Sequence, residues 1–130
     1  MEKKIIADTD VLIDYLDESK SRHDNTVIIL ENKNIIISIS SITVMELIVG
    51  AVNKTHLNRI NKELKGFLTI LPNPEIALIA IKLLHQYHLS HGLKIQDCFI
   101  AATALFVKIP LFTYNIKDFK FIDGLELYKI

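Results

Sequence analysis

The chain has 130 residues, of which 50% are hydrophobic and 23% charged, and its 15 basic residues balance its 15 acidic ones. This composition predicts one globular domain over residues 1–130, and its charge balance argues against broad, non-specific binding of nucleic acid, which usually requires a basic excess. No apolar run reaches the length needed to cross a bilayer, which argues against a transmembrane protein. The N-terminal lysines are soon followed by acids and Cys98 is the single cysteine, so we expect a cytoplasmic protein with no signal peptide, no disulfide and no membrane partner.

Strand-like and helix-like segments alternate along the first half of the chain. A short strand over residues 3–7 precedes a helix that begins near residue 11, and a second short helix follows over residues 23–32. The isoleucine-rich run 34–40 predicts a buried strand of the kind found in parallel sheets, and residues 41–50 continue as a helix.

The second half of the chain repeats this alternation. Asn73 and Pro74 mark a helix start, because Asn caps helices well and Pro suits the first helical position. The elements predicted here are, in order, a helix over 55–67, a strand over 67–71, helices over 73–88 and 97–108, and strands over 109–113 and 124–130. Strands separated by helices indicate an α/β sandwich with a mostly parallel sheet.

Four acidic residues fall where predicted strands end or where later helices begin. Asp8 ends the first strand, and Glu46 lies in the first turns of the helix after the second strand. Asp97 opens a later helix, and Asp118 follows the fourth strand. Ligand sites of such sheets lie beyond the carboxyl ends of the strands, so we expect the four acids to share one edge of the sheet.

Each acid also has a purely structural interpretation. Glu46 stands three residues after Thr43, which is the spacing of a capping box. The others would cap a helix or stabilise a turn: Asp8 and Asp10 at the first helix, Asp97 at a later one, and Asp118 together with Asn115. Four independent caps need not share one end of a sheet, so the combination favours a joint site.

The joint site that four carboxylates favour is one for a hard divalent cation. Mg²⁺ takes oxygen ligands, keeps several waters and usually needs one or two direct carboxylates, and Mn²⁺ accepts the same ligands. Two such ions about 4 Å apart would stabilise the attacking and leaving oxygens in phosphodiester hydrolysis. Other polar side chains would support the site by holding waters of the ion, and the candidates are Thr9, Asp10, Thr113 and Asn115.

Four motifs in a fixed order carry a resemblance to a known family. They are D-T-D from Asp8, S-x-x-T-x-x-E-L from Ser40, D-x-x-I-A-A-T-A from Asp97 and T-x-N-x-x-D-F from Thr113. At this chain length the set resembles the PIN-domain ribonucleases, above all the VapC-type toxins of toxin–antitoxin pairs. The resemblance spans nearly the whole chain. It implies metal-binding acids at Asp8, Glu46, Asp97 and Asp118, and supporting polar residues at Thr113 and Asn115.

The same resemblance implies a fold, an activity and partners. The fold would be a three-layer α/β/α sandwich with a mostly parallel five-stranded sheet in the order 3-2-1-4-5. The activity would be that of a metal-dependent endoribonuclease, in which metal-activated water cleaves RNA and leaves a 5′-phosphate and a 3′-hydroxyl. A small cognate antitoxin would inhibit by occupying the acidic groove, and a homodimer would be the usual assembly.

Two positions depart from the pattern of this family. Asp10 replaces the Asn or Ser often found there and adds one negative charge. Tyr114 stands where many relatives have Arg, so one phosphate contact is expected to be missing. Neither departure removes one of the four acids.

Two periodic sets of side chains carry less weight. A basic set recurs every three positions on a predicted helix and is a candidate for contacts with RNA phosphates, although a solvated helix face is the commoner explanation: Arg59, Lys62 and Lys65. A histidine set has metal-like spacing at the end of another helix: His85, His88 and His91. No cysteine accompanies the histidines, and we expect no zinc site there.

Three other functions compete with the nuclease. A phosphotransfer enzyme of the haloacid-dehalogenase type would use Asp8 as nucleophile and Asp10 as acid/base, but Leu12 stands where that family carries Thr or Val. A phosphorylation receiver needs an aspartate after its third strand, where this chain has Pro72 and Asn73. A non-catalytic PIN-like binding module would typically lose some acids. Since all four are present, the active nuclease is the favoured prediction.

Overall fold

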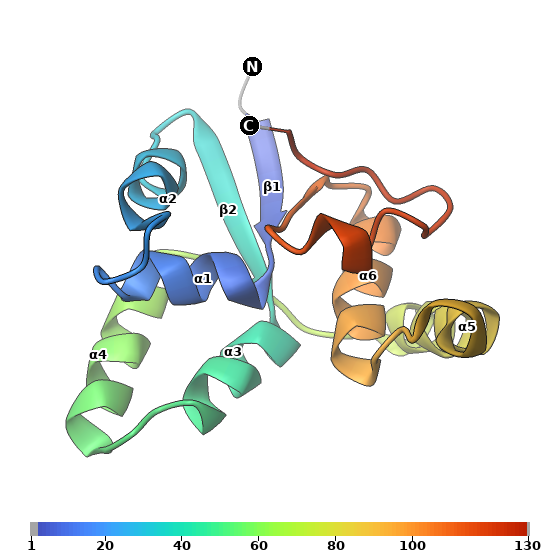
Figure 1. Ribbon diagram of the computed structural model, residues 1–130, viewed down its shortest axis with the longest axis horizontal. Coiled ribbons are helices and arrows are strands. Elements are labelled where there is room, and N and C mark those ends of the chain that lie inside the picture. The colour runs from blue at the N-terminus through green and yellow to red at the C-terminus, as the bar shows by residue number, and fades with distance from the viewer. Residues whose placement is uncertain (1–2, 130) are drawn as a thin grey trace.

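The computed structural model describes residues 3–129 and has three layers, with a parallel sheet between two layers of helices (Figure 1). The sheet order is β3-β2-β1-β4. The strands are β1 Lys3–Ala7, β2 Ile35–Ser40, β3 Leu68–Ile70 and β4 Leu111–Phe112. The predicted α/β/α sandwich with a parallel sheet is therefore confirmed.

The helices divide between the two faces of the sheet. The first four in the chain gather on one side and the last two on the other (Figure 1). They are α1 Thr9–Leu16, α2 His23–Leu30, α3 Ser41–Val49, α4 Lys54–Leu64, α5 Pro74–His91 and α6 Ile95–Val107, and the short 3₁₀ helix η1 spans Ile116–Asp118. Within residues 3–129, none of the helices is long and apolar enough to span a membrane.

The alternation of side chains along β1 builds the two cores. Ile5 and Ala7 pack with α1–α4, whereas Ile6 packs with α5 and α6. Phe112 and Leu111 of β4 divide in the same way between the two cores, and all five side chains are almost completely buried. A strand that is covered on both faces must be apolar at every position, which explains the continuous apolar run at the start of the chain.

The predicted fifth strand is the main difference between expectation and structure. Instead of a strand over 124–130, Leu127 forms a single parallel bridge to Leu111 of β4. The bridge is flanked by hydrogen bonds from Leu111 N to Glu126 O (2.9 Å) and from Tyr128 N to Leu111 O (2.8 Å). The segment lies beside β4 as expected, but β4 spans only Leu111 and Phe112, and the pairing is limited to the one bridge at Leu111. Residue 130 lies outside the described residues.

Helix boundaries also differ from the sequence-based expectations. Asn73 caps α5 by accepting a hydrogen bond from Ile76 N, as predicted, but the helix continues to His91 and ends where Gly92 adopts a left-handed conformation with φ 70°. The next helix begins at Ile95, so Asp97 is its third residue and not its first. This places the Asp97 carboxylate in the first turn of α6.

Candidate functional site

The carboxyl edge of the sheet brings the predicted acids together. Asp8 follows β1 directly, Glu46 lies in the second turn of α3 after β2, and Asp118 ends η1 shortly after β4. Asp97 arrives from the opposite helical layer, at the end of α6 that contacts α3. Figure 1 shows the start of α1, the start of α3 and the lower end of α6 meeting below β1. The parallel topology thus brings the four acids to one edge of the sheet, as their places in the sequence predict.

Asp8 is both a helix cap and a buried acid. Its carboxylate accepts hydrogen bonds from Thr9 N and from the Thr113 hydroxyl, each 2.8 Å long, and the residue is only 4% exposed. Burial raises the pKa of this carboxyl to about 8, and the nearby charge of Asp10 adds to the rise, while the hydrogen bonds from Thr113 and Thr9 oppose it. Holding Asp8 ionised at neutral pH therefore calls for a nearby positive charge.

Asp10 contributes a carboxylate with one unsatisfied oxygen. Oδ2 accepts a hydrogen bond from Tyr114 N at 3.0 Å, whereas Oδ1 is buried and has no hydrogen-bond partner among the described residues. Burial raises the pKa of Asp10, and the rise is opposed first by the Asp8 side chain, then by main-chain hydrogen bonds from Tyr114 and Val11, and last by the charge of Arg22. A buried carboxylate oxygen without a partner is costly, and a cation or its water would satisfy it.

Asp97 shows that acids from separate elements act on one another. Its pKa is raised to about 6, first by burial and then by the negative charges of Asp118 and Glu46, with a smaller contribution from Asp10. Lys94 acts in the opposite direction. The repulsion between carboxylates from α1, α3, α6 and η1 indicates a joint acidic site, which four unrelated caps would not produce.

Glu46 takes part in a contact between helices and does not form the capping box considered above. The N-cap of α3 is Ser40, whose hydroxyl accepts from Ile42 N at 3.2 Å, so Thr43 lies inside the helix. The Thr9 hydroxyl lies 2.7 Å from Glu46 Oε1 and 3.0 Å from Thr43 Oγ1. The capping-box interpretation is therefore wrong, and Thr9 connects the start of α1 to the acid on α3.

Asp118 and Asn115 form a turn through their main chains. Asp118 N donates to Asn115 O, and Asn115 N donates to the Thr113 hydroxyl; both hydrogen bonds are 3.0 Å long. These bonds leave the Asp118 carboxylate free to face Asp97, whose pKa it raises. Thr113 also bonds Asp8, so one hydroxyl joins the end of β1 to the turn after β4.

The donor chemistry of this site fits a hydrated divalent cation. Among residues 3–129, no group of three His, Cys, Asp or Glu side chains is close enough to enclose a metal ion. Mg²⁺ usually keeps several waters and needs only one or two direct carboxylates, so a dry cage is not required. The unpartnered Oδ1 of Asp10 and the raised pKa values of Asp8 and Asp97 are features that a bound cation would relieve.

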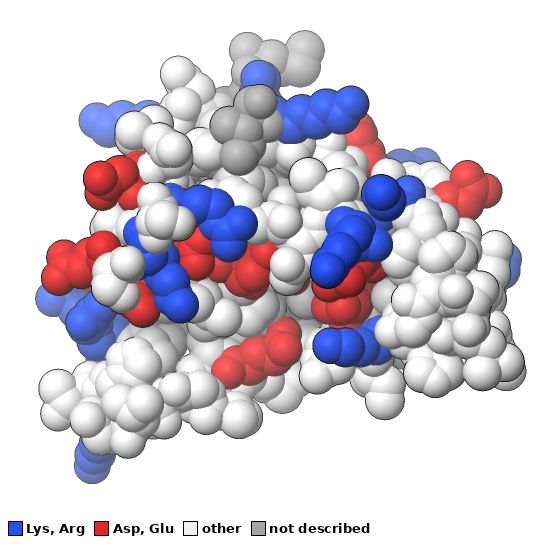
Figure 2. Space-filling model, viewed as in Figure 1, with Lys and Arg blue, Asp and Glu red and all other residues white. Residues whose placement is uncertain are grey.

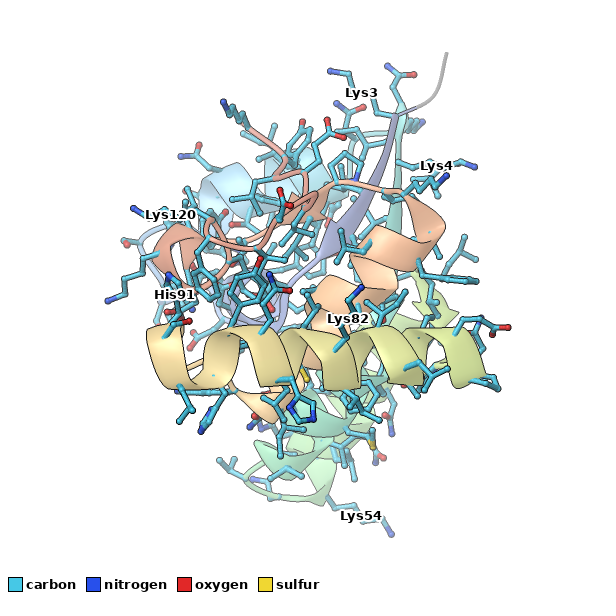
Figure 3. All side chains as sticks on the ribbon, turned by 90° about the vertical axis from the view of Figure 1, so that its right-hand side faces the viewer. Lys3, Lys4, Lys54, Lys82, His91 and Lys120 are labelled. Carbon is cyan, nitrogen blue, oxygen red and sulfur yellow. The ribbon has the colours of Figure 1, made fainter. Side chains whose placement is uncertain are left out.

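Within residues 3–129, the predicted basic and histidine sets form no hydrogen bond or ion pair with the four acids. Arg59 on α4 donates from a terminal nitrogen to Leu16 O at 2.6 Å. His91 stacks on Phe121 with ring centroids 4.1 Å apart, at the C-terminal end of the long helix in Figure 3. His88 donates from Nδ1 to Leu93 O at 2.9 Å. The remaining members are exposed: Lys62, Lys65 and His85.

Cys98 has a structural role. The residue is 2% exposed in the core between α5, α6 and the sheet, and its Sγ donates to Ile95 O at 2.9 Å. Burial is the main cause that raises the pKa of its thiol. The prediction of a small core residue is confirmed, since a buried thiol with a raised pKa is a poor nucleophile.

One part of the site has no local signature in the sequence. The guanidinium carbon of Arg22 lies 4.0 Å from the centroid of the Tyr114 ring, and the Tyr114 hydroxyl bonds the buried hydroxyl of Thr26. These contacts join residues some 90 positions apart, so only the tertiary fold reveals them. Asp14 lies in α1 and Arg22 stands just before α2, so no periodicity within one element links their opposite charges.

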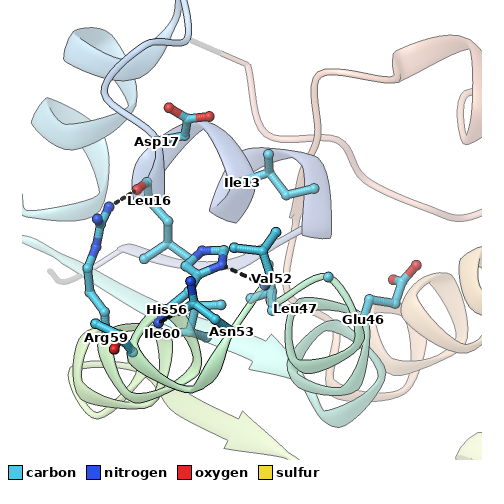
Figure 4. Close-up of a pocket in the computed structure, with 12 residues that line it drawn as sticks. Ile13, Leu16, Asp17, Glu46, Leu47, Val52, Asn53, His56, Arg59 and Ile60 are labelled. Carbon is cyan, nitrogen blue, oxygen red and sulfur yellow. Dashed lines mark hydrogen bonds between the residues drawn. The ribbon is translucent and has the colours of Figure 1, made fainter.

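A groove runs beside the acids, between α1, α3 and α4. Its volume is about 600 Å³, and of the four predicted acids only Glu46 lines it. Figure 4 shows Glu46 at one end of this groove and Arg59 at the other. The walls between them are mostly apolar and include Ile13, Leu47 and Val52.

The sequence and the fold were compared with known proteins. The model of the PIN-domain family matches residues 5–125, whereas no curated protein matches the chain. A toxin–antitoxin complex from Klebsiella pneumoniae contains a chain that is 33% identical, with a TM-score of 0.75 and coverage of 97% of this chain and 99% of that chain. VapBC2 from Rickettsia felis, bound to a DNA fragment of its promoter, is 25% identical with a TM-score of 0.78 and coverage of 96% and 97%. VapBC-1 from nontypeable Haemophilus influenzae is 25% identical with a TM-score of 0.77 and coverage of 97% of each chain.

Proposed function

Because the chain belongs to the PIN-domain family, we propose that it is the ribonuclease toxin of a toxin–antitoxin pair and that it hydrolyses RNA phosphodiester bonds. The observation that carries this proposal is the convergence of Asp8, Glu46, Asp97 and Asp118 at one edge of the sheet. There the charges of Asp118 and Glu46 act against that of Asp97, and the charge of Asp10 acts against that of Asp8. Natural proteins place like charges together at a cost in stability, and they do so mainly at functional sites.

PIN nucleases generally use divalent metal ions, and we propose Mg²⁺ here, with Mn²⁺ as an alternative. Asp8, Glu46, Asp97 and Asp118 would hold the ion directly or through its waters. When bound, such an ion supplies positive charge at the phosphate and lowers the pKa of a water. The choice of metal is independent of the family assignment and needs its own test.

The chain's own residues would orient this acidic site. The Thr113 hydroxyl and Thr9 N hold the two oxygens of Asp8, and the Thr9 hydroxyl holds Glu46. Asp10 is fixed through one oxygen by Tyr114 N, which leaves its other oxygen directed into the buried site. In this arrangement Thr9, Asp10, Thr113 and Asn115 support the four acids and do not replace them.

The proposed protein partner is a small antitoxin. Solved structures similar to this chain include toxin–antitoxin complexes. The groove between α1, α3 and α4 offers apolar walls that end at Glu46, which suits an antitoxin segment that covers the groove and reaches the acids with a basic side chain. A homodimer and a cytoplasmic location, where RNA substrates are found, complete the proposal.

The rival functions find less support. The PIN-family match extends over residues 5–125 and includes Asp8 and Asp10, the two acids that a haloacid-dehalogenase-type enzyme would use. A non-catalytic binding module has no need for mutually repelling carboxylates, and this chain retains all of them. The nuclease therefore remains the function that the site supports best.

The test is RNA cleavage by the purified protein with Mg²⁺ or Mn²⁺, with and without EDTA. We expect cleavage that leaves 5′-phosphates, its loss in EDTA, and its loss in Asp8→Asn and Asp97→Asn, with growth inhibition lost in the same variants. Asp123→Asn changes an exposed acid of the C-terminal segment and is the matched control, expected to cleave like the wild type. Full cleavage by Asp97→Asn would overturn the proposed site.

A further inference from the structure

Arg22 is held in place at the edge of the acidic site. It stands just before α2, and its Nε donates to Asp14 Oδ2 at 2.8 Å. Its guanidinium carbon lies 4.0 Å from the centroid of the Tyr114 ring, the geometry of a cation–π contact. The Asp14 side chain is 8% exposed and that of Arg22 is 51% exposed. One face of the guanidinium is thus packed against the protein while the rest of it reaches solvent.

The anchoring of Arg22 leaves most of its donors unused. Nε is the one guanidinium nitrogen that bonds a residue within 3–129, so both terminal nitrogens are without protein partners in this part of the chain. The two terminal nitrogens carry four N–H donors in a planar fork that matches two oxygens of a phosphate. A side chain already fixed at two points loses little further entropy when it binds such a group.

The position of Arg22 couples it to the acids. Tyr114, on which it stacks, donates its main-chain N–H to Asp10 Oδ2 at 3.0 Å, and its hydroxyl is bonded by Thr26. The guanidinium therefore adjoins the side of the site formed by α1 and the turn after β4.

A site built from carboxylates repels the polyanion that it is proposed to cleave. On the face in Figure 2, Lys and Arg side chains flank the acidic ones. Lysines are flexible point charges, whereas Arg22 is a fork fixed on the ring of Tyr114, the residue whose main-chain N–H bonds Asp10. We propose that Arg22 binds a phosphate of the RNA next to the acidic site and so positions the strand for cleavage; this inference rests on the proposed nuclease function.

A purely structural role for Arg22 makes different predictions. Asp14 is buried and pairs with Nε, so loss of Arg22 leaves a buried charge unpaired and destabilises the fold whether or not RNA is bound. A role in neutralising Asp14 would not change the dependence of RNA binding on salt. The double variant Asp14→Asn/Arg22→Gln removes both charges and separates the two roles.

The experiment measures cleavage kinetics and RNA affinity for Arg22→Gln, Arg22→Lys and the double variant. We expect KM for a short single-stranded RNA to rise about tenfold in Arg22→Gln and in the double variant, with a smaller change in kcat. For binding in an Asp97→Asn background, the slope of log K against log[salt] should fall by about 0.7 in magnitude for the one lost contact. Arg22→Lys should restore the slope and only part of the KM, because it keeps the charge and loses the fork.

Lys20→Gln removes an exposed charge two residues away and serves as the charge-matched control, with KM and slope expected to stay at wild-type values. A folded double variant with wild-type KM and wild-type salt slope would overturn the role of Arg22 while the nuclease function stands. If the wild type neither binds nor cleaves RNA, the proposed function and this inference both fail. The double variant decides the matter even where Arg22→Gln does not fold.

Discussion

Asp97→Asn should make the metal-free protein more stable while it abolishes cleavage. Asp97 lies on α6 among carboxylates from three other elements, and burial together with the charges of Asp118 and Glu46 raises its pKa. Asparagine keeps nearly the same volume and removes the charge. A residue placed for function at a cost in stability should show this opposite response of stability and activity.

The size of the effect follows from the pKa. A rise from 3.8 to about 6 is a shift of about 2 pH units. At about 1.4 kcal/mol per unit this corresponds to roughly 3 kcal/mol, which solvent screening of a half-buried group reduces to roughly 1–2 kcal/mol. In a domain of this size such a difference should raise Tm by roughly 4–8 °C.

The pH dependence gives the assay its specificity. Because the pKa of Asp97 is higher in the folded than in the unfolded protein, the wild type is most stable, as far as this group is concerned, below about pH 4. That stability is lost as pH rises through the folded pKa of about 6. Thermal unfolding in EDTA should therefore give similar Tm values for both proteins near pH 4 and a clear advantage for Asp97→Asn at pH 7.5.

If Asp97→Asn is no more stable than the wild type at pH 7.5, or if the gap does not depend on pH, the acids do not repel one another as the structure indicates. Asp123→Asn, which removes an exposed carboxylate, should leave Tm within roughly 2 °C of the wild type at both pH values.

Three further predictions test other parts of the structure. Mg²⁺ should raise the Tm of the wild type more at pH 8.5 than at pH 5.5, because protons on Asp8 and Asp97 compete with the ion, and equal shifts would argue against these ligands. Thr9→Val removes the 2.7 Å hydrogen bond to Glu46 and should lower the cleavage rate about tenfold in single-turnover assays. Thr9→Ser retains the hydroxyl and should cleave at the wild-type rate, and a wild-type rate in Thr9→Val would contradict the role of Thr9. Phe112→Ala should lower the free energy of unfolding in urea by about 3–5 kcal/mol, because the Phe112 side chain is fully buried. A loss of less than about 1 kcal/mol would show that Phe112 does not pack in the core beside β4.

Much of the fold could be predicted because local patterns and tertiary structure agree. The apolar runs of β1 and β2 are covered on both faces, and Asn73 with Pro74 starts α5 as predicted. The four acids lie near strand ends and helix starts, and parallel topology brings those ends to one edge. The prediction that they lie close together needed only the order of the elements and not their exact bounds.

The rest depended on contacts that local sequence does not encode. Thr43 and Glu46 have the spacing of a capping box, yet Ser40 takes the cap and Glu46 pairs with Thr9 from another helix. The fifth strand is reduced to one bridge because β4 is only two residues long. Arg22 reaches the site through the Tyr114 ring, which is far away in sequence. In each case a tertiary partner decides between alternatives that the sequence leaves open.

The central claim is that these acids jointly bind a divalent cation, and Mn²⁺ titration followed by electron paramagnetic resonance tests it most directly. We predict that the wild type binds Mn²⁺ and that Asp8→Asn and Asp97→Asn each weaken binding by more than about tenfold, while Asp123→Asn leaves it unchanged. A wild type that binds no Mn²⁺, or an Asp97→Asn variant with wild-type affinity, would contradict the claim.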